Sequence, residues 1–249
     1  MKLKSMLTAL ALICFVAAQA QTAKVPTADE IVTKYLNAIG GKDKWKALKS
    51  MTITAKMSMM GMDLPMTLYS KPANKQKAVI SVQGVEIVQA YDGKDAWAIN
   101  PLGGGKEPQL IPAEDAKQMT EEEFESEFID YGAKGHVVNY QGIEEIDGVK
   151  CYKLELVKNK NNDKEDVTEI YFFDAENFVP ISTKSYARSG QMKGQEIQTY
   201  LSDYQDVNGL MIAFFTEAKV GGQTVQKLTM EKVSFNDAMD DSIFAFPKK

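Results

Sequence analysis

Few side chains in this sequence are of the types that usually perform catalysis or bind transition metals. The chain has one histidine, His136, and two cysteines, Cys14 and Cys151. A zinc site or a Ser-His-Asp triad needs partners that one imidazole cannot supply. We therefore interpret His136 as a structural or surface residue at a strand edge and Cys151 as a small buried hydrophobe. We expect a protein that is not an enzyme, with no metal and no cofactor.

An acidic cluster between Glu121 and Asp130 is the densest group of oxygen ligands in the chain. It lacks the Asp, Asn and Gly spacing of a calcium-binding loop. We predict a solvated helix face, with Phe124 and Phe128 turned inward. Two acids that are distant in sequence could still meet in the fold, so a hydrolase built from dispersed carboxylates is one hypothesis for the function.

Methionine is the unusual residue type in this chain. Six methionines fall within sixteen residues, where a strand core would ordinarily use Val and Ile. These are Met51, Met57, Met59, Met60, Met62 and Met66. A thioether side chain is unbranched and polarizable, and it adapts to apolar partners of variable shape. The cluster indicates either a lipid-binding surface or ordinary core packing.

Two helices are expected ahead of the methionine cluster. Thr27 and Glu30 have the spacing of a capping box, and apolar residues then recur at helical intervals as far as Ile39. The pattern predicts a helix over residues 28–39, ended by Gly40 and Gly41. Asp43 caps a second short helix, which presents Trp45 on the same side.

From Thr52 onward the apolar period changes to two, which is typical of half-buried strands. About eleven strands are predicted. After the first, from Thr52, they cover residues 64–70, 77–82, 85–91, 96–100, 149–157, 168–173, 181–187, 197–204, 210–219 and 223–235. Turn pairs such as Asn208-Gly209 and Gly221-Gly222 separate neighbouring strands, so we expect antiparallel pairing in a meander.

The longest interruption of the strand pattern covers residues 101–134, and its second part has helical composition. We predict a mainly β fold of the α+β class, in which one curved antiparallel sheet forms an incomplete β-barrel. Its open apolar side would be covered by the helices as a lid, because no other elements are left to bury it.

The first twenty residues match a secretory signal peptide. Lys2 and Lys4 precede an apolar run, and Ala18-Gln19-Ala20 ends the segment. The run is shorter than the ~20 residues of a spanning helix. We therefore expect a signal peptide at residues 1–20, a single domain at residues 21–249, a periplasmic location and no membrane span. A net charge of -5 disfavours nucleic acid as a partner.

Three segments carry a resemblance to a known family. They are ADEIVTKYLNAIGGKDKWKALKSM followed by TITAKMSM, the hairpin VQAYDGKDAWAINP, and residues 199–236. They resemble exported proteins of the outer-membrane lipoprotein-sorting class, the periplasmic lipoprotein carrier and its outer-membrane receptor. The resemblance implies an incomplete barrel that holds acyl chains under a helical lid in a Gram-negative periplasm. Carriers of that class latch the lid with an arginine on an early strand, whereas the arginine of this sequence is Arg188.

From these observations we expect a binding or carrier protein for lipid or lipoprotein acyl chains, with an envelope protein as a further partner. Burial of acyl methylenes stabilises such a complex by ~0.8 kcal/mol each without any catalytic group. The expected cavity residues share the apolar parity of the early strands: Ile53, Met57, Met59, Leu64, Met66, Leu68, Ile80, Val82, Trp97 and Ile99. The alternative is a structural or interaction module of the envelope whose cup is filled by its own side chains.

Overall fold

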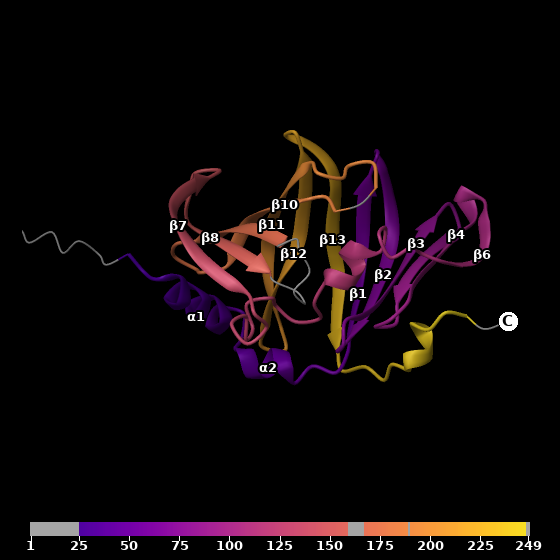
Figure 1. Cartoon of the computed structure of the whole chain (residues 1–249), viewed down its shortest axis with the longest axis horizontal. Coiled ribbons are helices and arrows are strands. Elements are labelled where there is room, and N and C mark those ends of the chain that lie inside the picture. The colour runs from indigo at the N-terminus through magenta and orange to yellow at the C-terminus, as the bar shows by residue number, and fades with distance from the viewer. Residues whose placement is uncertain (1–24, 159–166, 189, 248–249) are drawn as a thin grey trace, which may run out of the picture.

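The computed structural model describes residues 25–158, 167–188 and 190–247. The expected signal peptide, residues 1–20, lies outside these ranges. In the described part, helices α1 (Ala28–Ala38) and α2 (Lys42–Lys46) precede a curved antiparallel sheet (Figure 1). A third helix, α3 (Lys117–Glu121), and two 3-10 turns, η1 (Pro101–Gly103) and η2 (Asp241–Ile243), complete the helical elements of these ranges. None of the helices in the described ranges is long and apolar enough to cross a bilayer.

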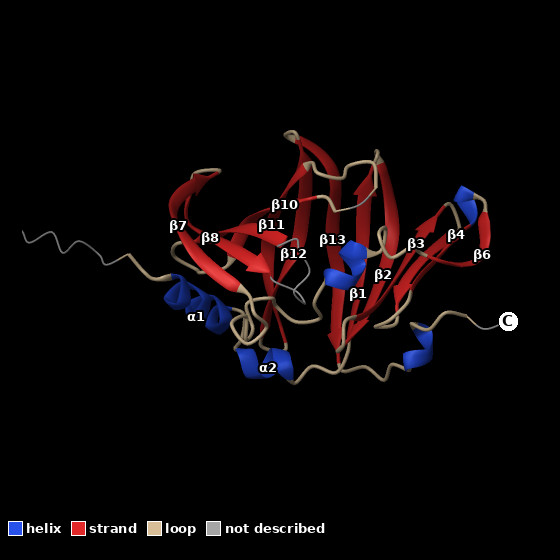
Figure 2. Cartoon of the chain, in the orientation of Figure 1, coloured by secondary structure: helices blue, strands red, loops and turns tan. Residues whose placement is uncertain are grey.

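The described ranges contain thirteen strands in one sheet (Figure 2). Their bounds are β1 (Met51–Met59), β2 (Met62–Lys71), β3 (Lys75–Val82), β4 (Val85–Tyr91), β5 (Ala96–Asn100), β6 (Gly105–Leu110), β7 (Val137–Ile146), β8 (Val149–Lys158), β9 (Val167–Asp174), β10 (Pro180–Tyr186), β11 (Glu196–Val207), β12 (Leu210–Val220) and β13 (Gln223–Phe235).

The sheet is a meander in which the first and last strands of the chain lie side by side in the centre and two strands from the middle of the chain form the edges. The strand order runs β6-β5-β4-β3-β2-β1-β13-β12-β11-β10-β9-β8-β7. Each strand pairs with the next strand along the chain, except that β6 and β7 do not pair with each other. The first and last strands, β1 and β13, also pair, for example through Ile53 and Val233. The gap of this incomplete barrel therefore lies between β6 and β7, and residues 111–136 connect its two sides.

The hairpin turns follow the expected chemistry. Asn208-Gly209 and Asp147-Gly148 both have positive φ at the two central residues. This is the conformation of the two-residue turn whose twist matches that of paired strands. The predicted antiparallel meander is confirmed by these turns and by the registers of the neighbouring strands.

Helix α1 begins where the capping box predicted. The Thr27 hydroxyl accepts from the backbone N–H of Glu30, and the Glu30 carboxylate accepts from that of Thr27 at 2.7 Å. The buried side chains Ile31 and Val32 then pack against Phe128 and Phe173, together with Leu154 and Leu156. The helix thereby covers the inner face of the sheet at the β7–β9 end.

Two expectations about the elements hold only approximately. The sheet has thirteen strands in the described ranges rather than about eleven. Strand β6 lies inside the stretch predicted as loop and helix, residues 101–134, and β7 begins just after it. Pro108 in β6 and Gly142 in β7, the latter at a bulge with positive φ, hide the strand pattern. The acidic stretch is helical only over the five residues of α3.

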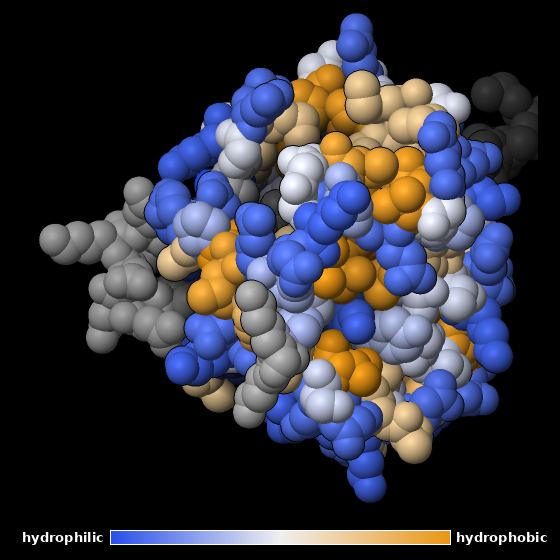
Figure 3. Space-filling model, turned by 90° about the vertical axis from the view of Figure 1, so that its right-hand side faces the viewer, coloured by the Kyte–Doolittle hydropathy of each residue, from blue (hydrophilic) through white to orange (hydrophobic). Residues whose placement is uncertain are grey.

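The outer face of β4 and β5 is covered by the C-terminal segment. The indole of Trp97 donates a hydrogen bond of 2.7 Å to the carbonyl of Phe244. Lys71 and Lys75 both pair with the Asp241 carboxylate at the start of η2. The view from this end shows hydrophobic patches separated by hydrophilic side chains (Figure 3). Phe246 of the C-terminal segment is 37% exposed.

Candidate functional site

The inner face of the curved sheet is apolar along β1, β2 and β3. Ile53 pairs with Leu68 and Met57 with Leu64, so these four side chains lie on one face of β1 and β2. Met66 pairs with Ile80, which extends the same face to β3. The alternation of the strands thus collects the apolar residues of three neighbouring strands on one surface.

The structure places eight of the ten predicted cavity residues on this inner face. They are Ile53, Met57, Met59, Leu64, Met66, Leu68, Ile80 and Val82. Met66 and Leu68 line a hollow, whereas Met57 and Leu64 are buried with 7% exposure each. Their binding of a ligand stays a prediction.

Trp97 and Ile99 lie on the opposite face, so the expectation that all ten residues share one face is wrong for these two. Trp97 pairs with Ala90 and Ile99 pairs with Val88, and these four residues form an outer cluster. The β5 sequence is apolar on both faces because the C-terminal segment covers the outer one. Its inward residues include the small Ala98.

Residues 111–136 cross the inner face from the end of β6 to the start of β7 (Figure 1). The side-chain amide of Gln76 on β3 donates to the carbonyl of Met119 at 2.7 Å. The backbone N–H of Phe124 donates to the side-chain oxygen of Asn74 at 3.2 Å. These residues, the lid of the predicted fold, are therefore held to the early strands by two amide side chains. Arg188 lies after β10 and so is not on an early strand, where the lipoprotein carriers have their latching arginine.

A hollow of about 610 Å³ lies between this crossing segment and strands β2 to β5. Its floor holds Met66, Leu68, Ala78 and Ala98, and Ile111 and Met119 close it from the segment, with Gln76, Gln89, Asp115 and Glu122 as its polar lining. The two alanines leave space that larger side chains would fill. The volume is within the range of small-molecule sites.

A second hollow of about 420 Å³ lies on the other side of the crossing segment. Tyr35 and Ile39 of the helical unit and Leu201, Tyr204 and Ile212 of the sheet line its apolar part. Five glutamates line the rest: Glu122, Glu123, Glu125, Glu127 and Glu169. Beyond it, the inner face at the β7–β9 end is filled by the cluster around Phe128.

Two of these glutamates meet at one lysine and one tyrosine. Lys158 pairs with the carboxylates of Glu127 and of Glu169, the latter at 2.7 Å. The hydroxyl of Tyr171 contacts both carboxylates through their second oxygens. All four oxygens are thus engaged. The acid pair that a hydrolase would require is present, but it is occupied in anchoring the crossing segment to β8 and β9.

Burial controls the protonation of this group. Desolvation and the neighbouring charge of Glu169 raise the pKa of Glu127. Burial opposes the charge of Lys158, but the two carboxylates outweigh it and raise the pKa of that lysine. Because the Tyr171 hydroxyl has a single hydrogen, it can donate a full hydrogen bond to only one of the two carboxyl groups at a time.

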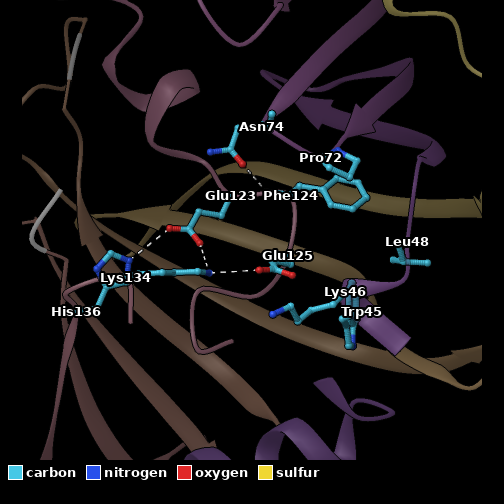
Figure 4. A pocket seen from close by; sticks show the side chains of 11 residues that line it. Trp45, Lys46, Leu48, Pro72, Asn74, Glu123, Phe124, Glu125, Lys134 and His136 are labelled. Atoms are coloured by element: carbon cyan, nitrogen blue, oxygen red, sulfur yellow. Dashed lines mark hydrogen bonds and ion pairs between the residues drawn. The ribbon is translucent and has the colours of Figure 1, made fainter. Parts of the chain in front are cut away.

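A third pocket of about 500 Å³ opens beside α2 (Figure 4). Trp45 and Lys46 line one side, and Lys134 and His136 lie across from them. Lys134 pairs with Glu123 at 2.5 Å, and His136 lies 3.4 Å from the same glutamate. His136 is buried with 4% exposure, so it is structural and not a surface residue.

The acidic cluster is therefore not a solvated helix face. The side chain of Glu123 is 7% exposed and that of Glu127 is 18% exposed, because both turn toward lysines of the fold. Phe128 is buried as predicted, with 2% exposure. Among the described residues no group of three or more His, Cys, Asp or Glu side chains is arranged to hold a metal ion.

Several lining residues were not predicted. Gln76 and Ala78 share the parity of Ile80 and Val82, so the alternation of β3 could have identified them. Asp115, Met119 and the glutamates of the crossing segment carry no such signal. Their position over the sheet depends on the pairing of β1 with β13, which fixes where the barrel opens.

The cysteine prediction is confirmed by the structure. Cys151 is fully buried in a cluster with Ile146 and Phe172. Burial is also the main cause that raises the pKa of its thiol to about 11.

Comparisons with known proteins agree with this architecture. A family model described as an uncharacterized protein matches residues 81–246. A putative outer membrane lipoprotein-sorting protein domain from Vibrio parahaemolyticus has a TM-score of 0.57 at 14% identity, with 86% of this chain and 94% of that chain covered. No curated protein matches the sequence.

Two further solved structures have the same fold. A LolA superfamily protein from Nitrosomonas europaea has a TM-score of 0.58 at 15% identity, and a DUF1329 family protein from Desulfovibrio piger has a TM-score of 0.58 at 12% identity. In both comparisons 89% of this chain and 98% of the other chain are covered. At this level of identity the similarity concerns the fold alone.

Proposed function

We propose that this chain, which belongs to the family whose model matches residues 81–246 and has the fold of a LolA superfamily protein, binds the acyl chains of lipids or lipoproteins as a non-enzymatic carrier in the periplasm. The acyl chains would lie on the inner face of the sheet, beneath residues 111–136. An envelope protein would load or receive them.

The hollow of about 610 Å³ is the observation that carries this proposal. Its floor is apolar, it is closed on one side by a segment held through a few hydrogen bonds, and its lining includes two flexible thioethers, Met66 and Met119. Acyl chains need only such a surface, since each buried methylene contributes ~0.8 kcal/mol. Methionine adapts to chains of different shape.

Filling the hollow tests the proposal. In the Ala78→Trp variant an indole would occupy the space between β3 and Met119. We expect the purified variant to lose most binding of a fluorescent fatty-acid probe, at least tenfold, while the wild type binds it and carries co-purified lipid detectable by mass spectrometry.

Thr67→Trp is the matched control. Thr67 pairs with Val79 on the outer face of β2, so its indole cannot enter the hollow. We expect wild-type probe binding from this variant. If the wild-type protein carries no lipid and binds no probe, the carrier function is excluded, and a module with a self-filled cup becomes the better description.

A further inference from the structure

The two inner-face hollows share an acidic lining. Six carboxylic acids line them: Asp115, Glu122, Glu123, Glu125, Glu127 and Glu169. None of the described residues that line either hollow is Lys or Arg. We propose, on the basis of the carrier function above, that this site selects lipids with an amine-bearing, cationic head group and rejects lipids with an anionic phosphate head group.

The basic residues near the hollows are already committed to the acids. Lys158 lies between Glu127 and Glu169, and Lys134 lies 2.5 Å from Glu123 and 3.6 Å from Glu125. These two lysines therefore pair with four of the six acids, Glu123, Glu125, Glu127 and Glu169. A ligand phosphate would find no unengaged cation in the lining of the two hollows and would add a further negative charge beside these carboxylates.

Glu122 is the acid best placed to meet a head group. It lines both hollows and a smaller one that shares lining residues with each, so it stands where an acyl chain on β2–β5 would end. The lining of the smaller hollow includes Lys75, which pairs with Asp241. Among the described residues Glu122 has no basic partner within ion-pair distance. Desolvation raises its pKa, while a hydrogen bond with Gln76 and the charge of Lys158 act in the other direction. An ammonium group beside it would further favour the charged carboxylate.

An ammonium head group complements this arrangement. It supplies three hydrogen-bond donors, and the acids and the amide oxygens of Gln76 and Gln89 supply acceptors around the same hollow. The apolar floor then takes the acyl chain. The chemical class indicated is a lipid with a primary amine and without excess negative charge.

Three probes with one acyl chain test the inference. Oleylamine, oleyl alcohol and oleyl phosphate would each compete with a neutral fluorescent probe for the purified protein. We expect oleylamine to bind at least tenfold more tightly than oleyl phosphate, with oleyl alcohol between them. The ratio should fall several-fold in Glu122→Gln.

Glu86→Gln is the matched control, because it removes the same charge from an exposed position on the outer face of β4. It should leave the ratio unchanged. A thermal unfolding curve by circular dichroism checks that both variants fold. If Glu122→Gln does not fold, the same competition ratio is measured in Asp115→Asn, where it should also fall.

The outcomes separate this inference from the carrier function. If all three probes bind equally, or if oleyl phosphate binds most tightly, the head-group preference is wrong while lipid binding stands. If the ratio falls equally in Glu122→Gln and Glu86→Gln, net charge and not the site governs it, and the inference is again wrong. If none of the probes binds, the carrier function itself fails.

Discussion

The carboxyl groups of Glu127 and Glu169 share one lysine and one tyrosyl hydroxyl. This group joins the crossing segment to β8 and β9 through Lys158, Glu169 and Tyr171. A buried ion that loses its partner is costly, whereas a neutral group that keeps the hydrogen bonds is not. The local stability therefore depends on hydrogen-bond satisfaction more than on charge.

This reasoning predicts losses of stability of different size for two substitutions. Glu127→Ala leaves Lys158 and Tyr171 with one partner fewer and should lower the free energy of unfolding by about 2–3 kcal/mol. Glu127→Gln keeps an acceptor for the lysine and a donor for the tyrosine, and should cost less than about 1 kcal/mol. Urea unfolding at neutral pH measures both. Equal losses in the two variants would show that the carboxylate charge is required.

Cys151 should be chemically silent in the folded protein. It is fully buried, and its thiol has a pKa of about 11, raised mainly by burial. At pH 8 the reactive thiolate is therefore scarce as well as shielded. In the chain from residue 21 onward, which has no other cysteine, we expect reaction with Ellman's reagent only after urea unfolding. Rapid labelling without denaturant would contradict the buried position of β8.

Among the elements, the C-terminal segment has the clearest pH dependence. Hydrogen bonds from Lys71 and Lys75 lower the pKa of Asp241 to about 2. A carboxyl group whose folded pKa is depressed stabilises the folded form above its unfolded pKa of about 3.9 and loses that contribution as the pH falls toward the folded value. The attachment of η2 to β2 and β3 should therefore weaken between about pH 4 and pH 2.

Trp97 reports on that attachment because its indole donates to Phe244. In a Trp45→Phe background, we expect acrylamide quenching of Trp97 to rise over this pH range. Asp241→Asn should raise the quenching already at neutral pH, whereas Asp147→Asn, in the β7–β8 turn, should not. If Asp241→Asn leaves both the neutral value and the acid profile unchanged, the ion pairs do not hold the segment.

On the scale of the whole molecule, the central strands and the crossing segment should differ in stability. Strands β1 and β13 pair on both sides. The only helix in residues 111–127 is the short α3, and the segment is held by a few hydrogen bonds to the early strands and by the ion pair of Glu127 at its end. Local opening is easiest where few backbone groups are paired and little surface is buried.

Hydrogen exchange followed by mass spectrometry measures this difference. We expect amides of residues 111–127 to exchange at least tenfold faster than those of β1 and β13, and to slow when an acyl ligand is added. Gln76→Ala should speed exchange in α3, and Gln205→Ala, on β11, should not. Protection of the segment equal to that of β1 would mean that it is a fixed part of the core.

The sequence by itself determined the local structure of this protein. The capping box at Thr27, the period-two strands and the turn pairs such as Asn208-Gly209 encode α1 and most of the sheet, because these signals act over a few neighbouring residues. The shared parity of Ile53, Met66 and Ile80 likewise placed them correctly on one face.

Only the tertiary structure decided where the barrel opens and what lines it. The pairing of β1 with β13 joins residues about 180 positions apart. It leaves the gap at β6 and β7, and thereby lays residues 111–136 across the inner face. The C-terminal segment covers the outer face of β5 and so reverses the side on which Trp97 is buried. Such contacts depend on long-range packing, which no local pattern of residue types records.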